Sequence, residues 1–268
     1  MFSKFDMNYK ENLFEELSKS TKFEKLGKGR YGAVLADIHK NVVQGKASLF
    51  LQEHLASPKV VPIVRTTTKY NNPIQKFSQI HYDIMKNIKD IKDIIFNNAL
   101  IEIYDKDYTK MGEHSDQALD LDINSYICLF SCYDNPDTKD IRTLKIKDKI
   151  TGELSEISLT HNSIILFSVK TNSNYLHKIV LDKSYADDKW LGITFRLSKT
   201  YIEFVNEIPY FYKTDKKLKL ANEEEIKEFY KMRQTENKNS VFEYPEINYT
   251  ISKSDLLFMV EALNNHLD

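Results

Sequence analysis

Residues 111–116 read Met-Gly-Glu-His-Ser-Asp, and the rest of the chain is organised around this stretch. Successive side chains of an extended chain point to opposite faces, so His114 and Asp116, two residues apart, point the same way. A single metal ion could bind both. An imidazole and a carboxylate suit a first-row transition metal, and a second histidine would complete the facial triad of a non-haem Fe(II) site. The sequence offers His177 for that place.

A second His-x-Asp pattern, His81-Tyr82-Asp83, lies in a different context. Apolar residues recur around it at three- to four-residue spacing, which predicts an amphipathic helix over residues 74–90. At about 100° per residue, positions 81 and 83 diverge by about 200° around that helix, so the two side chains cannot share one metal.

Strand-like runs surround His114. Residues 99–104 lead through a polar turn and Gly112 to the histidine, and residues 126–130 follow it. A His-x-Asp pair at the edge of a β-rich region lies where the ligands of a barrel-mouth site belong. On these residues alone, a metal site and two ordinary surface side chains remain open alternatives.

The composition narrows the class of protein. A length of 268 residues allows one large domain or one domain with appendages. Lys and Arg number 38 and Asp and Glu 39, which gives a net charge of -1, so no global basic field favours nucleic acid. Cys128 and Cys132 are expected to be core thiols in a reducing compartment. Residues 1–10 lack a signal-peptide segment and no apolar run reaches the roughly 20 residues that span a bilayer, so a soluble, cytoplasmic protein is expected.

The first predicted segment, residues 1–57, is expected to be a helical and loop extension. It has one apolar face at residues 13–17 and another at residues 49–55. The glycine-rich stretch 26–34 between them fits the phosphate-covering loop of protein kinases. The chain has neither the His-Arg-Asp nor the Asp-Phe-Gly triplet that a kinase needs, so a structural loop is predicted.

The second segment, residues 58–205, is predicted to be the β-dominated core of an α+β fold. Its short strand-like runs are 60–70, 99–104, 126–130, 144–147, 154–159, 163–167 and 190–198. Arg196 is an ionised residue inside the last run, which otherwise has a buried pattern. Such a residue needs an anionic partner, and either a bound carboxylate ligand or a structural Asp or Glu would serve.

The third segment, residues 206–268, is predicted to be a C-terminal helical appendage. Asn222, followed by three glutamates, predicts the start of a helix. Ser252 or Ser254 is expected to cap a final helix that carries apolar residues between 256 and 263.

Five segments, in their order and spacing, resemble the AlkB-like Fe(II)/2-oxoglutarate-dependent dioxygenases over roughly residues 58–200. These segments are 96–104, 111–116, 159–165, 171–177 and 194–196. The Gly-x-His-x-Asp piece at 112–116 combined with the Thr-Phe-Arg ending at 194–196 is the most specific part. The resemblance implies a double-stranded β-helix, or jelly roll, with the N-terminal helices and the C-terminal appendage around it.

The resemblance also implies roles for individual residues. Arg196 would pair with a carboxylate of 2-oxoglutarate through its planar fork of donors, and Tyr104 would donate a hydrogen bond to it. O2 would be the second co-substrate, with succinate and CO2 as products beside a hydroxylated substrate. His161 falls at the turn before a buried strand and is not a ligand in this scheme. Fe(II) would be held by three residues: His114, Asp116 and His177.

Three positions depart from the family's pattern. The usual Asn two residues before the Tyr is Glu102, which would repel an anionic co-substrate unless it points away. The Arg six residues before Arg196 is Trp190, and the acid two residues after the metal Asp is Ala118. These departures weaken the nucleic-acid repair function more than the oxygenase function.

Three functions follow as alternatives. The first is an Fe(II)/2-oxoglutarate oxygenase that hydroxylates a small molecule or a protein side chain. The second is an oxidative N-demethylase of alkylated DNA or RNA. The third is a non-enzymatic binding module, against which the intact triad argues. Salt-dependent binding to a single-stranded oligonucleotide is expected for the second alone, and a backbone groove for it could be lined by Arg65, Lys69, Tyr70, Lys76 and Lys110.

Overall fold

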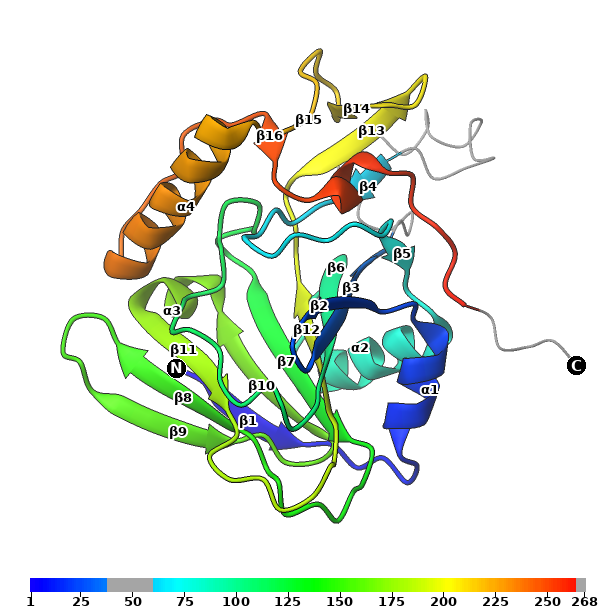
Figure 1. Ribbon diagram of the computed structural model, residues 1–268, viewed down its shortest axis with the longest axis vertical. Helices are drawn as coiled ribbons and strands as arrows, with labels where there is room; N and C mark the ends of the chain where they lie inside the picture. Colours follow the sequence, from blue (N-terminus) through cyan, green and yellow to red (C-terminus); the bar gives the residue numbers. More distant parts are fainter. Residues whose placement is uncertain (38–59, 264–268) are drawn as a thin grey trace, which may run out of the picture.

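The computed structural model describes residues 1–37 and 60–263 (Figure 1). Its largest part is an eight-stranded sheet with the order β1-β10-β7-β12-β6-β3-β2, in which β5 pairs with β3. Every neighbouring pair is antiparallel except β3 with β5. The strands are β1 (Ser3–Asp6), β2 (Glu24–Gly27), β3 (Arg30–Ala36), β5 (Gln75–Lys76), β6 (Asn98–Tyr104), β7 (Tyr126–Tyr133), β10 (Ser163–Ser168) and β12 (Trp190–Arg196).

The large sheet is covered on both faces, which explains why its central strands β7, β10 and β12 are mostly apolar. On one face, Leu191, Ile193 and Phe195 of β12 pack in a common core with helices α1 (Leu13–Ser20) and α2 (Gln79–Ile91). On the other face, Trp190 packs in a second core with a three-stranded sheet of order β11-β8-β9 (Figure 1). Its strands are β8 (Thr143–Asp148), β9 (Leu154–Ser158) and β11 (Tyr175–Val180).

The central part of the chain folds much as the sequence predicts. The runs predicted as strands between residues 99 and 198 form β6 to β10 and β12, and the helix predicted over 74–90 is α2. Within the extended run 60–70, only β4 (Val60–Pro62) is a strand. A short helix, α3 (Val169–Asn174), comes directly before β11 and was not predicted. The result is a mixed α/β protein dominated by antiparallel strands.

The N-terminal prediction is wrong in part, because residues 1–37 supply three strands of the large sheet as well as the expected helix at Leu13. The glycine-rich stretch is the turn of the β2–β3 hairpin, where Gly29 adopts a φ of +66° that favours glycine. Ala33 and Ala36 have weak strand preference, and pairing with β6 along all of β3 supplies what the local sequence lacks. The apolar face predicted at 49–55 lies outside the described residues.

The C-terminal part contains a small sheet and a long helix. Strand β13 (Tyr201–Val205) pairs with β14 (Ile208–Phe211) and with β4, and β15 (Lys219–Leu220) pairs in parallel with β16 (Tyr249–Thr250). Helix α4 (Glu223–Lys238) begins at the predicted cap, where Asn222 and Glu225 exchange side-chain-to-backbone hydrogen bonds.

The predicted final helix is wrong. Only the short 3-10 helix η2 (Lys253–Leu256) forms, because Val260 instead exchanges backbone hydrogen bonds with Ile74 and Lys76. None of the described helices has the length and apolar character needed to cross a bilayer.

Candidate functional site

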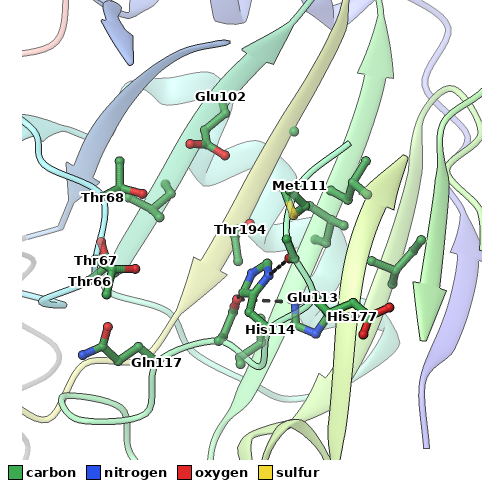
Figure 2. A pocket seen from close by; sticks show the side chains of 18 of the residues that line it. Thr66, Thr67, Thr68, Glu102, Met111, Glu113, His114, Gln117, His177 and Thr194 are labelled. Carbon is green, nitrogen blue, oxygen red and sulfur yellow. Dashed lines mark hydrogen bonds and ion pairs between the residues drawn. The ribbon is translucent and has the colours of Figure 1, made fainter. Parts of the chain in front are cut away.

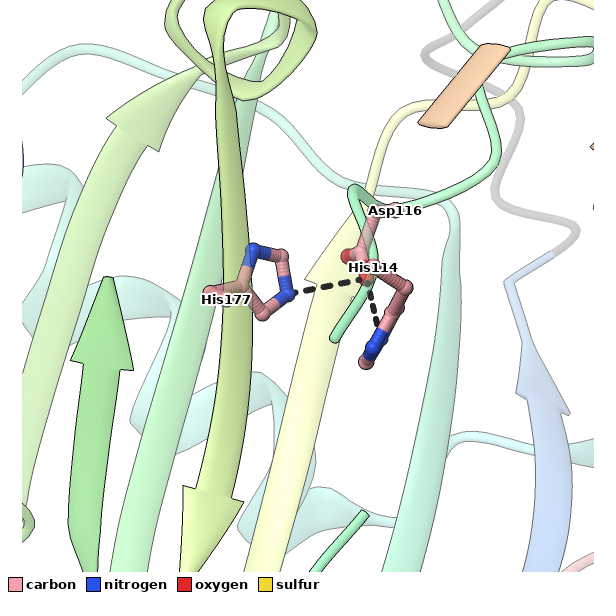
Figure 3. Close-up of side chains that lie close together, drawn as sticks. All are labelled: His114, Asp116 and His177. Atoms are coloured by element: carbon pink, nitrogen blue, oxygen red, sulfur yellow. Dashed lines mark ion pairs between the residues drawn. The ribbon is translucent and has the colours of Figure 1, made fainter. Parts of the chain in front are cut away.

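Three side chains that the sequence singled out meet at one end of the two sheets (Figure 3). Residue His114 forms an antiparallel bridge with His177 of β11, through backbone hydrogen bonds of 3.0 and 2.6 Å. The extended chain predicted around His114 therefore exists, and it points Asp116 to the same side. Asp116 Oδ1 lies 3.5 Å from His177 Nε2 and 3.8 Å from His114 Nε2. All three candidate ligand atoms lie within 4.8 Å of one another, and no other such group of three occurs among the described residues.

The other histidine candidates have structural roles. His81 is fully buried in the first turn of α2, where its Nδ1 accepts a hydrogen bond from the backbone N–H of Ser78. Asp83 instead accepts from Gln79. His161 Nδ1 accepts from the backbone N–H of Tyr133. The preference for His177 over His161 agrees with this arrangement.

Side chains from two helices hold the loop that carries His114 and Asp116. The backbone N–H groups of Ser115, Asp116 and Ala118 each donate to a side chain rather than to a neighbouring strand. Asn172 of α3 also donates back to the carbonyl of Asp116 at 2.7 Å. The three acceptors are Asn237 Oδ1 at 3.0 Å, Asn172 Oδ1 at 2.7 Å and Glu236 Oε1 at 2.9 Å.

Helix α4 is part of the site rather than a separate appendage. Arg233 pairs with Glu236 and donates to the carbonyl of Ser115. The cavity in front of the three candidate ligands is lined by Tyr230, Arg233, Gln234 and Asn237. The sequence predicted this helix through its cap, but its capping residues carry no information about the surface on which the helix packs.

Electrostatics favour the protonation states that a metal requires. Burial lowers the pKa of His114 well below its usual value, and the positive charge of Arg233 lowers it further, so the ring is neutral at pH 7. Burial by itself would raise the pKa of Asp116, but the hydrogen bond from His177 and the charge of Arg196 outweigh it and lower the pKa. A neutral imidazole and an ionised carboxylate are ready to bind a cation without losing a proton.

A cavity of about 380 Å³ extends from the triad between the two sheets (Figure 2). Alternate residues of β12 form one wall, and Leu144 of β8 with His177 and Ile179 of β11 form the other. The mouth is polar: Thr66, Thr67, Thr68 and Gln117 lie on the side of His114 away from His177 (Figure 2). Gln117 is 3% exposed, and neither polar atom of its amide has a hydrogen-bond partner in the described part of the chain. No sequence pattern singles it out beyond its place after Asp116.

Arg196 lies in the cavity wall on β12 and is 2% exposed. No described residue forms a hydrogen bond with its Nε or Nη2 atom, and the charges of Asp116, Glu102 and Asp120 act on it without a described ion pair. The sequence left a structural acid and a bound ligand as equal partners for this residue. The described structure contains no such structural acid, so the guanidinium is free to meet an anion in the cavity.

The hydroxyl of Tyr104 is directed at another residue. It donates to Glu102 Oε2 at 2.5 Å, and Tyr70 donates to Glu102 Oε1 at 3.2 Å. Arg30 Nε lies 3.0 Å from the same Oε1, so the charge of Glu102 is balanced. The repulsion expected from Glu102 is therefore offset within the protein. The hydrogen bond from Tyr104 to a co-substrate stays a prediction. To form it, the Tyr104 hydroxyl would have to give up its hydrogen bond to Glu102.

Trp190 closes the end of the cavity away from Arg196. Its ring lies 4.8 Å from the ring of Tyr104, centroid to centroid, and covers Gly192 so closely that a Cβ at Gly192 would lie 2.0 Å from Cη2 of the indole. Its Nε1 is buried without a partner. The position at which the resembling family has an arginine is thus occupied by an aromatic ring.

Known proteins resemble this chain in structure but not in sequence. No protein-family model and no curated protein matches the sequence. Among solved structures, that of OsALKBH1 is similar, with a TM-score of 0.43 and 12% sequence identity over 73% of this chain and 97% of the other.

Proposed function

We propose that this protein is an Fe(II)-dependent oxygenase that couples oxidative decarboxylation of a 2-oxo acid to hydroxylation of a C–H bond in a small molecule or a protein side chain. In this proposal the large sheet and the β11-β8-β9 sheet are the two halves of a jelly roll. The observation that carries it is the presence, in one cavity, of a His-Asp-His group and a buried arginine without a partner.

The donor set fits an Fe(II) ion. Two imidazoles and one carboxylate are the ligands of the facial triad, which leaves positions open for other ligands. Ligands about 2.1 Å from a metal and at right angles to each other lie about 3 Å apart. The distances of 3.5 and 3.8 Å from Asp116 to His177 and His114 require only a small side-chain movement to reach that separation. Iron bound there would supply the oxidising chemistry, with O2 as oxidant.

The remaining residues bind and shield the reactants. Arg196 would bind the carboxylate beside the 2-oxo group, because a buried guanidinium gains most from a charge-assisted pair in a dry wall. The apolar walls, among them Leu144 and Ile179, would exclude water from the site. The resemblance found in the sequence implies 2-oxoglutarate as the acid, and Arg196 supports the half of that molecule that carries the 2-oxo group.

The nucleic-acid alternative loses much of the groove suggested for it. Arg65 is buried in an ion pair with Asp120, and Tyr70 is 2% exposed. Lys76 pairs with Glu261. Three of the five residues suggested for a backbone groove are therefore engaged within the protein, and no other observation favours this function.

Turnover of the metal-loaded protein tests the proposal. Fe(II), ascorbate and a panel of 2-oxo acids are added to the purified protein, and release of CO2 is followed with and without candidate substrates. Substitution of any ligand (His114→Ala, Asp116→Ala or His177→Ala) should abolish CO2 release and metal binding and leave the circular dichroism spectrum unchanged. Asp83→Ala, at the exposed aspartate of the His-x-Asp pattern in α2, is the matched control and should retain full activity. Activity that survives all three ligand substitutions would disprove the metal assignment.

A further inference from the structure

The charges that line the cavity limit which acid can occupy it. Among the described residues, the lining contains three arginines and no lysine. Arg30 is paired with Glu102, and Arg233 is paired with Glu236. Arg196 alone has no acidic partner. The described part of the cavity therefore offers a single unpaired positive charge.

The cavity wall that leads away from Arg196 is apolar. The cavity face of β12 carries Arg196, Thr194, Gly192 and Trp190 in turn, so the arginine and the tryptophan come from opposite ends of the strand. The indole covers Gly192 and so fills part of the space between them. Leu144 and Ile179 face the same space from the smaller sheet.

The polar groups at this end are neutral or already paired, because the cation Arg30 is held by Glu102. Trp190 Nε1 is a single uncharged donor, and the hydroxyl of Tyr104 is committed to Glu102. Glu102 stands directly opposite Gly192 on the neighbouring strand and lines the cavity. A second ligand carboxylate placed here would lose its water and would have to compete with Glu102 for Arg30, the cation already paired there. Burial of an unpaired charge is strongly disfavoured.

We propose that the acid used by this protein is a 2-oxo monocarboxylic acid with an apolar side chain, and that the dicarboxylate 2-oxoglutarate is a poor fit. This inference rests on the proposed function and narrows its co-substrate. The carboxylate beside the 2-oxo group pairs with Arg196, and the side chain of the acid lies against Trp190, Leu144 and Ile179. Burial of the apolar side chain then supplies the affinity that a dicarboxylate would need from an ion pair with its second carboxylate.

The overall reaction balances for such an acid. The bond between its carboxylate carbon and its 2-oxo carbon breaks, and the carboxylate leaves as CO2. One atom of O2 completes the carboxylate of the shortened acid, and the other enters the C–H bond of the substrate. The acid and the C–H bond each give up two electrons, which together reduce O2.

Binding measurements on the full chain test the inference without turnover. Dissociation constants are measured by calorimetry in the absence of O2 on Fe(II)-loaded protein, with 4-methyl-2-oxopentanoate, phenylpyruvate and 2-oxoglutarate as probes. The two apolar acids are expected to bind about 10- to 100-fold more tightly than 2-oxoglutarate. Equal or tighter binding of 2-oxoglutarate overturns the inference and leaves the oxygenase proposal standing. If the protein binds Fe(II) but none of the three acids, both are overturned.

Two substitutions of Trp190 sharpen the comparison. Trp190→Arg introduces a cation at the apolar end and should tighten 2-oxoglutarate at least about tenfold while weakening the apolar acids. Trp190→Phe is the matched control, because it keeps an aromatic ring, and should preserve the wild-type order of affinities. Iron affinity and circular dichroism report whether each variant is folded. If the Trp190→Arg variant folds and still prefers the apolar acids, the inference is contradicted. If that variant does not fold, the affinities of the wild type for the three acids decide the question.

Discussion

Replacement of Arg196 with methionine is expected to raise the stability of the protein and to reduce its response to a 2-oxo acid. The guanidinium is 2% exposed and two of its nitrogens have no hydrogen-bond partner among the described residues, so in the acid-free protein only the charges of neighbouring acids such as Asp116 offset its lost hydration. Exchange of buried charges for well-packed apolar side chains of similar volume often stabilises a protein by about 1–4 kcal/mol. We expect Arg196→Met to fall within that range.

The loss of acid binding follows from the same residue. A charge-assisted hydrogen bond contributes about 1.5–3 kcal/mol, which corresponds to a Kd that is about 10- to 150-fold weaker when it is lost. At 100 times its Kd, an acid stabilises the wild type by about 2.7 kcal/mol. At the same concentration the variant should gain almost nothing. Arg196→Lys keeps the charge but lacks the planar fork, so it should bind the acid weakly without the gain in stability.

Thermal unfolding of iron-loaded protein without O2, with and without acid, measures both effects. Each kcal/mol should move the midpoint by about 2–4 °C in a chain of this size. The two variants should bind iron as the wild type does when no acid is present. A lower midpoint for acid-free Arg196→Met would refute the reasoning, because it would reveal a structural partner whose loss leaves a charge unpaired.

Two further predictions concern buried positions. Burial lowers the pKa of His81 to about 4, so between pH 6.5 and 4 the unfolded chain binds a proton that the native chain rejects, and stability falls as the pH falls. Urea unfolding should show that the free energy of unfolding falls by about 2 kcal/mol between pH 7 and pH 5. In His81→Gln, which can keep the capping interaction, this fall should be smaller. An equal fall in the variant would mean that other groups cause it. Gly192→Ala should destabilise the protein by about 1–3 kcal/mol in the same assay, because the new Cβ overlaps the Trp190 ring, whereas Gly27→Ala, with open space around it, should cost less. Equal losses at both glycines would show that the ring moves aside.

The cavity wall could be predicted from the sequence because its information is local. On β12, a cation at position 196 interrupts a run of apolar residues, and the alternation of side chains places Arg196 on the same face as Trp190. The pairing of His114 with Asp116 followed for the same reason, because two residues of spacing on extended chain put both side chains on one side. The choice of His177 came from the family resemblance, and the bridge to β11 that brings it to them is a long-range contact.

The rest depends on contacts that no local pattern records. Strand β1 has four residues and gains its structure from pairing with β10, about 160 positions later. The cap at Asn222 marks where α4 starts, yet nothing around it indicates that Glu236 and Asn237 reach the backbone beside His114. No sequence pattern indicates the role of Arg30 either, although it balances the charge of Glu102.

The side chains that hold the loop at residues 115–118 should also limit its motion. Its backbone N–H groups donate to side chains of Asn172, Glu236 and Asn237, so in deuterated water they should exchange with the slow rates of a sheet although the segment belongs to none. A cation that arrives would find its carboxylate and imidazole already fixed, and little chain entropy remains to be lost on binding. The affinity for a metal would then depend on Glu236 and Asn237 of helix α4, which lie more than 100 residues further along the chain than the candidate ligands His114 and Asp116.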